Sequence, residues 1–169
     1  GLNNYNTEKE LFTNYLADST NSNSIPANEI VSLYLDAKEQ LWIGTSKGLS
    51  VLNPVTGKFS TYRHDPNDST SLSGNIVLEV FSDSKGRTWL ATQNGLSLYL
   101  PGADAFKVYR NDPTDKNSLS HNYTLSLCED KAGNKPVAKQ EPLVPELHKC
   151  MPCGKGLSRR TGKKKGKFW

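Results

Sequence analysis

Long apolar runs are missing from this chain of 169 residues. No stretch approaches the roughly 18 to 20 consecutive apolar residues that a membrane-spanning helix needs, and no charged segment followed by an apolar one opens the sequence. We therefore expect no membrane-spanning segment in the residues given. Methionine is equally scarce, since Met151 is the only one and the chain starts at Gly1. We expect the chain to be an internal piece of a longer protein, whose address or anchor lies elsewhere.

Cysteine is also rare, and three cysteines do not support a disulfide framework. His148, Cys150 and Cys153 form a His-x-Cys-x-x-Cys pattern. A structural zinc site needs four ligands in two well-spaced pairs, and the sequence has no second pair. We interpret this pattern as chance and assign no metal ligand to it.

Positive charge is concentrated at the end of the chain. Residues 1–134 contain 11 Lys and Arg against 15 Asp and Glu, a net charge of −4, whereas residues 135–169 contain 10 against 2, a net charge of +8. The overall charge of +4 is thus the sum of a negative first part and a strongly positive last part. Because the basic excess belongs to the last fifth of the chain, it says nothing about the rest, and we expect no nucleic-acid partner.

The basic segment 135–169 is rich in proline and lysine and has no apolar periodicity, so we expect it to be disordered. One interpretation is a reading-frame error in the source sequence. The other is a genuine basic tail that binds nucleic acid or anionic lipid through charge alone. We favour the first, because basic runs without aromatic residues between them are weak evidence of recognition.

A repeat of 47 residues organises the first 134 residues. Its successive starts are Gly1, Gly48 and Gly95, and no insertion is needed to keep later positions in phase. A fixed period of about 20 to 50 residues is typical of solenoids and propellers. The residues that recur in phase are Phe12, Phe59 and Phe106; Tyr15, Tyr62 and Tyr109; Ile25, Leu72 and Leu119; Asn28, Asn75 and Asn122; Asp36, Asp83 and Asp130; and Trp42 with Trp89.

Each repeat has the pattern of β-strands. Apolar and polar residues alternate after the long loop of each unit, then come a turn that begins with aspartate, a tryptophan strand and two further strands. Four short antiparallel strands per repeat predict a propeller blade. We therefore expect an all-β fold, a partial β-propeller with an incomplete ring. Its predicted parts are half a blade at 1–16, whole blades at 29–63 and 76–110, and the first strand of a further blade at 122–129.

The tryptophan strand carries a family resemblance. The sequence Leu-Trp-Ile-Gly-Thr at 41–45, followed by Gly48 and Leu49, preceded by Asp36 and followed later by Phe59, resembles the two-component regulator propeller repeat. The resemblance covers residues 1 to about 134. It implies blades of the periplasmic sensor domain of bacterial hybrid two-component system histidine kinases, which are membrane-anchored receptors. It also implies a small glycan ligand, a homodimeric receptor, and the remaining blades and domains of that receptor as partners.

The repeat breaks down near residue 135. In phase, a third tryptophan strand starts there, but Pro136 stands at the position of Trp42 and Trp89. The chain therefore holds half a blade, two whole blades and the inner strand of a fourth, which cannot close a ring. We expect this piece alone to have two unpaired sheet edges and marginal stability.

Candidate site residues are few, and we assign none to catalysis, metal binding or a cofactor. We interpret Asp36, Asp83 and Asp130 as turn caps, because a calcium site needs several alternating oxygens and lysines occupy these turns. Trp42 and Trp89 are interpreted as core between blades, with stacking on a sugar face as the alternative. The sequence leaves the ligand-binding residues unknown.

His64 and His121 lie at non-equivalent repeat positions, so we interpret them as loop residues; catalysis needs a base, a nucleophile and an orienting group that the sequence does not assemble. Cys128 takes a strand position that aromatic residues hold in the other repeats, which predicts a small core residue. The long loops 64–74 and 111–121 are interpreted as structural, although such loops also carry ligand contacts.

The repeat and its residues are compatible with three functions. The favoured one is non-enzymatic, a binding and signalling module in which a ligand captured on the propeller shifts the packing of receptor domains. A propeller lyase resembling the streptogramin lyases needs acidic and histidine ligands in the central channel, and none recurs in phase. A propeller that acts only as a scaffold for other proteins is the third. A kinase domain downstream in the parent gene separates the first from the other two.

Overall fold

The structure is a computed structural model that describes residues 1–135 and 137–139. In this part of the chain every regular element is a β-strand, and all pairing is antiparallel. No helix there is long and apolar enough to cross a membrane. The predicted all-β class with four-stranded antiparallel blades is confirmed.

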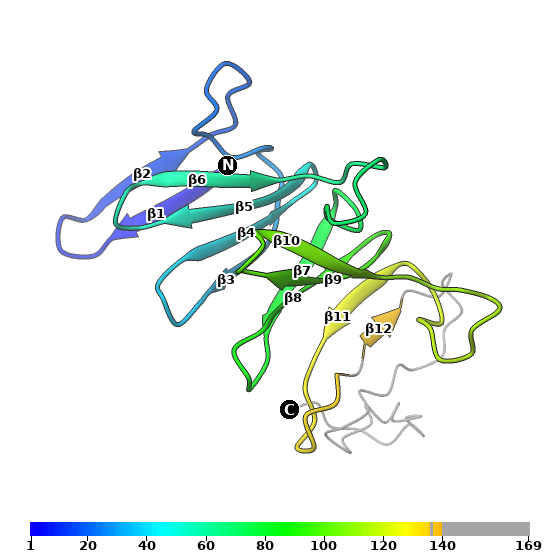
Figure 1. Ribbon diagram of the computed structural model, residues 1–169. Coiled ribbons are helices and arrows are strands. Elements are labelled where there is room, and N and C mark those ends of the chain that lie inside the picture. The colour runs from blue at the N-terminus through cyan, green and yellow to red at the C-terminus, as the bar shows by residue number, and fades with distance from the viewer. Residues whose placement is uncertain (136, 140–169) are drawn as a thin grey trace, which may run out of the picture.

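The strands form four sheets that follow one another in chain order (Figure 1). The N-terminal half-blade contains β1 and β2, the C-terminal half-blade contains β11 and β12, and the two full blades between them have four strands each. In Figure 1 the two half-blades lie at opposite ends of the row. The bounds are β1 Leu2–Asn6, β2 Leu11–Tyr15, β3 Ile30–Leu35, β4 Leu41–Thr45, β5 Gly48–Asn53, β6 Lys58–Tyr62, β7 Val77–Ser82, β8 Thr88–Thr92, β9 Gly95–Leu100, β10 Ala105–Tyr109, β11 Thr124–Leu127 and β12 Val137–Lys139.

The first strand of each blade has an irregularity at the same repeat position. The register shifts after Ile30 in β3, after Val77 in β7 and after Thr124 in β11. These three residues are 47 positions apart. A bulge bends and twists the strand locally, so the repeat preserves backbone shape as well as side-chain pattern.

Strand β12 lies within the segment that the sequence predicted to be a basic tail. It pairs with β11 in the register that β8 has with β7, so that Val137 lies opposite Leu127 as Leu90 lies opposite Val80. The fourth unit therefore has two strands where one was expected, and the blade pattern continues to Lys139. A valine, an alanine and a lysine suffice here because backbone hydrogen bonds do not depend on the lost tryptophan. The rest of the predicted tail, residue 136 and residues 140–169, lies outside the described residues.

The core lies between the blades. One cluster joins Trp42, Leu49 and Val51 of the first full blade to Val80 and Leu90 of the second. A second cluster joins Trp89 of the second full blade to Leu127 of β11. Trp42 and Trp89 are 3% and 8% exposed, which confirms their interpretation as core between blades. Burial of such large side chains contributes most of the force that holds neighbouring blades together.

Each long loop between blades is closed by polar contacts at repeated positions. The Oδ1 atoms of Asn28, Asn75 and Asn122 accept hydrogen bonds at 2.7 to 2.8 Å from the backbone N–H eleven residues earlier. Leu72 is fully buried beneath its loop and Leu119 packs against the second cluster, so the predicted structural role of these loops is confirmed.

The N-terminal end leaves apolar side chains exposed that equivalent positions bury. Leu33 of β3 is 53% exposed, whereas Val80 and Leu127, at the same repeat position, are each 6% exposed. Phe12 of β2 is 66% exposed, against 4% for Phe106. The equivalent residues are buried against a neighbouring blade, so these two positions show how much each blade depends on the one before it.

One turn position offers a test of the repeat. Glu39 and Gly86 both end the turn after the first strand, with φ of 60° and 70°. A Cβ built on Gly86 meets no atom within 4 Å, so only the left-handed backbone opposes a side chain there. Gly86→Ala should lower the free energy of unfolding by about 1 kcal/mol, and Glu39→Gly should raise it by about half as much.

Urea unfolding followed by tryptophan fluorescence measures both changes. Gly57→Ala serves as a control in another turn, because Gly57 has φ of 65° and equally open space, and it should behave like Gly86→Ala. Effects of the same sign for Glu39→Gly and Gly86→Ala contradict the equivalence of the two turns.

Candidate functional site between the blades

An aspartate in each repeat joins the first turn of the blade to its second strand. Asp36 Oδ1 accepts hydrogen bonds from the backbone N–H of Lys38 at 2.8 Å and Gln40 at 2.9 Å, which confirms turn capping. Its Oδ2 accepts a hydrogen bond from the indole Nε1 of Trp42 at 2.9 Å. The carboxylate thus fixes the position of the turn relative to the buried tryptophan. This second role was not predicted, although the six-residue spacing of aspartate and tryptophan in two repeats is its signal in the sequence.

Asp83 repeats this arrangement and adds two cations. Its Oδ2 accepts from Trp89 Nε1 at 2.9 Å and from Arg87 Nε at 2.7 Å, and Lys135 Nζ lies 3.4 Å away. Burial alone raises the pKa of this fully buried carboxyl. The hydrogen bonds from Trp89 and Arg87 outweigh that effect and hold the pKa well below its ordinary value of 3.8.

Lys135 fills the junction between the second full blade and the C-terminal half-blade. Its ammonium also lies 2.9 Å from Glu129 Oε1. Glu129 accepts hydrogen bonds from the backbone N–H and the hydroxyl of Ser84 across the junction. Asp130, in phase with Asp83, caps its own turn and bonds to Asn134 Nδ2, since no tryptophan follows it.

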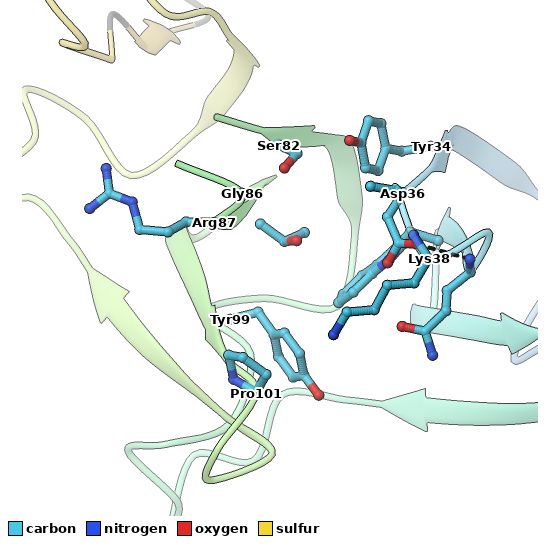
Figure 2. Close-up of a pocket in the computed structure, with 12 residues that line it drawn as sticks. Tyr34, Asp36, Lys38, Ser82, Gly86, Arg87, Tyr99 and Pro101 are labelled. Atoms are coloured by element: carbon cyan, nitrogen blue, oxygen red, sulfur yellow. Dashed lines mark hydrogen bonds between the residues drawn. The ribbon is translucent and has the colours of Figure 1, made fainter. Parts of the chain in front are cut away.

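The junction between the two full blades is open where Glu129 and Lys135 fill the next junction. It forms a cleft of about 360 Å³, which we call the interblade cleft. Figure 2 shows Tyr34, Asp36 and Lys38 of the first full blade on one side and Ser82 and Tyr99 of the second on the other. The remaining lining residues are Ala37, Gln40, Trp42, Gly86, Arg87, Thr88 and Pro101. A few polar groups beside aromatic rings are typical of small-molecule sites.

The aromatic wall of the cleft is held rigidly. The rings of Trp42 and Tyr99 meet edge to face with centroids 5.1 Å apart. The hydroxyls of Tyr62 and Tyr99 both donate to Asp104 Oδ1, at 2.6 and 2.8 Å. These bonds lower the pKa of Asp104, while burial and the Asp104 charge raise the pKa of Tyr62. Both tyrosines are therefore neutral donors with fixed ring planes.

A second cavity of about 600 Å³ lies between the loop after β2 and the first full blade. It is more polar, with the loop from Ala17 to Pro26 on one side and Lys47, Thr61 and Arg63 on the other. The buried hydroxyl of Thr61 has no hydrogen-bond partner among the described residues. This cavity has no aromatic ring in its lining.

The other residues singled out in the sequence lie apart from the cleft. His64 Nδ1 lies 2.7 Å from the carbonyl of Leu72, and His121 Nδ1 accepts from the N–H of Tyr123, so both histidines stabilise loops. Cys128 follows β11 directly and is half-buried, which corrects its expected place in the core. Because β11 ends two residues before the position equivalent to Ser82, the last residue of β7, Cys128 lies outside the strand. His148, Cys150 and Cys153 lie outside the described residues.

Among residues 1–135 and 137–139, no group of three or more His, Cys, Asp or Glu side chains is placed to hold a metal ion.

The blades define a segment of a β-propeller, and comparison with known proteins identifies the repeat. Residues 24–47, which run from the first long loop through β4, match the family described as two component regulator propeller. The resemblance to that family is therefore confirmed. No curated protein is similar enough to this chain to count as a match.

One of three similar solved structures supports this result. The extracellular domain of a hybrid two component system, BT3049 from B. thetaiotaomicron, is 29% identical, with a TM-score of 0.58 over 65% of this chain and 16% of that one. A second such domain from the same organism, BT4673, is 20% identical, with a TM-score of 0.41 over 81% and 23%. PorZ of Porphyromonas gingivalis, a surface component of the type-IX secretion system, is 16% identical, with a TM-score of 0.50 over 74% and 18%, and shows the fold alone. This chain thus spans about a sixth of the BT3049 domain.

The Asp83 network predicts an acid-dependent part of the stability. Asp83→Asn should lower the free energy of unfolding at neutral pH by about 2 kcal/mol, because the charge-assisted hydrogen bond from Arg87 weakens and the ion pair with Lys135 is lost. Since the folded state lowers this pKa, the contribution is present above about pH 4 and is lost as the pH falls below that value. The difference between wild type and variant should therefore shrink in acid.

Denaturant unfolding at a series of pH values measures this difference. Asp115→Asn is the matched control, because Asp115 is exposed and its side chain caps only a loop. A constant difference for Asp83→Asn from neutral pH into acid rules out the charge network as its source.

Proposed function

We propose that this chain is part of the ligand-sensing propeller of a hybrid two-component receptor, on the outer side of the membrane, and that it detects glycan fragments without acting as an enzyme. The observation that carries the proposal is the repeat at 24–47 together with the BT3049 domain, which is an extracellular domain of such a system. The chain would work together with the other blades and domains of its receptor, and the receptor would be a homodimer in the periplasm.

The interblade cleft supports the choice of a glycan. Sugars offer hydroxyls to polar side chains and an apolar face to aromatic rings. The cleft combines both, since its lining includes Tyr34 and Tyr99 together with the hydroxyl-bearing Ser82 and Thr88 and the amide of Gln40. A ligand there touches two blades at once and so favours one relative placement of them, which is what a sensor requires.

Binding of the 169-residue chain to an array of plant, bacterial and host oligosaccharides tests this proposal, with calorimetry for every sugar that binds. Thr88→Val removes a hydroxyl from the cleft at constant volume and should weaken binding about tenfold, as expected for one lost ligand hydrogen bond. Thr61→Val is the matched control in the second cavity and should leave the affinity unchanged.

Three outcomes are informative. Loss with Thr88→Val alone supports the cleft, and loss with Thr61→Val alone supports glycan detection but moves it to the second cavity. If no oligosaccharide binds to a chain whose circular dichroism shows folded β-structure, glycan detection is wrong and the scaffold alternative gains support.

A further inference from the structure

The two junctions that flank the second full blade are built from the same repeat positions, and they differ in charge. At the junction with the C-terminal half-blade, the positions in question hold Glu129 and Lys135. At the junction between the full blades, 47 residues earlier, they hold Ser82 and Thr88, which both line the interblade cleft. The cleft is therefore the space that a glutamate and a lysine fill in the next junction.

The aspartate of each junction has a different environment as a result. Asp83 is paired with Arg87 at 2.7 Å and with Lys135 at 3.4 Å. Asp36 has the same bonds to its turn and its tryptophan, but Gln40 stands where Arg87 does and Thr88 where Lys135 does. Within the described part of the chain, no cation lies within 4.0 Å of the Asp36 carboxylate.

Neighbouring cations do not supply the missing charge. Arg87 lines the cleft but points away from Asp36 in Figure 2, because its Nε bonds to Asp83. Lys38 belongs to the same turn as Asp36, and Lys85 holds the equivalent place beside Asp83, so both junctions have this lysine. Besides the changes from Arg87 to Gln40 and from Glu129 to Ser82, the junctions thus differ by the ammonium of Lys135, which Thr88 replaces in the cleft.

We propose that the interblade cleft binds a primary ammonium group, with Asp36 as its counter-ion, at the position that Lys135 occupies in the next junction. Tyr34 and Tyr99 also line the cleft, and aromatic rings favour a cation that lies over their faces. The ligand is then a small amine with polar groups, either an amino sugar or a lysine side chain. The proposal rests on the proposed function only in the choice of a sugar as carrier of the amine.

Calorimetry on the 169-residue chain tests the proposal with four probes: glucosamine, glucose, N-acetylglucosamine and Nα-acetyl-lysine amide, at about pH 6, where primary amines are protonated. Glucosamine should bind at least about tenfold more tightly than glucose and N-acetylglucosamine, which lack the charge. A comparable affinity for the lysine derivative identifies the ammonium alone as the determinant. A much weaker one assigns the site to amino sugars.

Two substitutions test the site itself. Thr88→Lys places the lysine of position 135 into the cleft, so it should abolish glucosamine binding while keeping or raising the melting temperature. Lys38→Ala removes a like charge from the cleft and should tighten glucosamine binding about threefold without changing the affinity for glucose. Lys58→Ala, on an exposed position of β6, is the control and should change neither affinity.

The proposal is overturned if glucose binds as tightly as glucosamine, or if Thr88→Lys retains glucosamine binding in a folded chain. Oligosaccharide binding without a preference for the amine overturns the ammonium site and leaves glycan detection standing. Failure of every sugar with binding of the lysine derivative keeps the ammonium site and contradicts glycan detection.

Discussion

The hydrogen bond between an aspartate carboxylate and a tryptophan indole, made in both full blades, fixes the relation between turn and core. The carboxylate holds two backbone N–H groups of its turn and the indole N–H of the next strand at 2.8 to 3.0 Å. The indole can be buried between blades only because this bond satisfies its one polar atom. The same carboxylate then faces the neighbouring blade, where its charge needs a partner. The aspartate side chain thus determines both how the tryptophan packs and which charge must be balanced at each junction.

The two junctions balance the charge of this aspartate differently, and this difference connects the fold to the proposed function. Where Lys135 and Arg87 neutralise Asp83, the space is filled and the contact is structural. Where Ser82 and Thr88 replace the longer side chains, the space stays open beside Asp36 and the aromatic wall. Repeats share a backbone, so small changes at a few positions are enough to turn one junction into a binding site.

The sequence predicted the strands because the 47-residue period and the alternation of apolar residues are local signals. It predicted the turn caps from the aspartates for the same reason. It did not predict β12, since a lost tryptophan conceals a strand that backbone pairing still forms. It did not predict the cleft either, because Asp36 and Ser82 are distant in the chain and meet only when blades stack. Comparing Thr88 with Lys135 across the repeat would have indicated that the two junctions differ in charge. The comparison would not have shown that the smaller side chain leaves open space.

Hydrogen exchange of the indole N–H groups, followed by nuclear magnetic resonance, tests the central role of the aspartate–tryptophan bond most directly. We predict that the Nε1 protons of Trp42 and Trp89 exchange far more slowly than those of an exposed indole, because each is bonded to a carboxylate and buried. We also predict that the two protons exchange together as a blade junction opens. Exchange of either proton at the rate of a free indole, in a chain whose backbone amides stay protected, would contradict the central role of this bond.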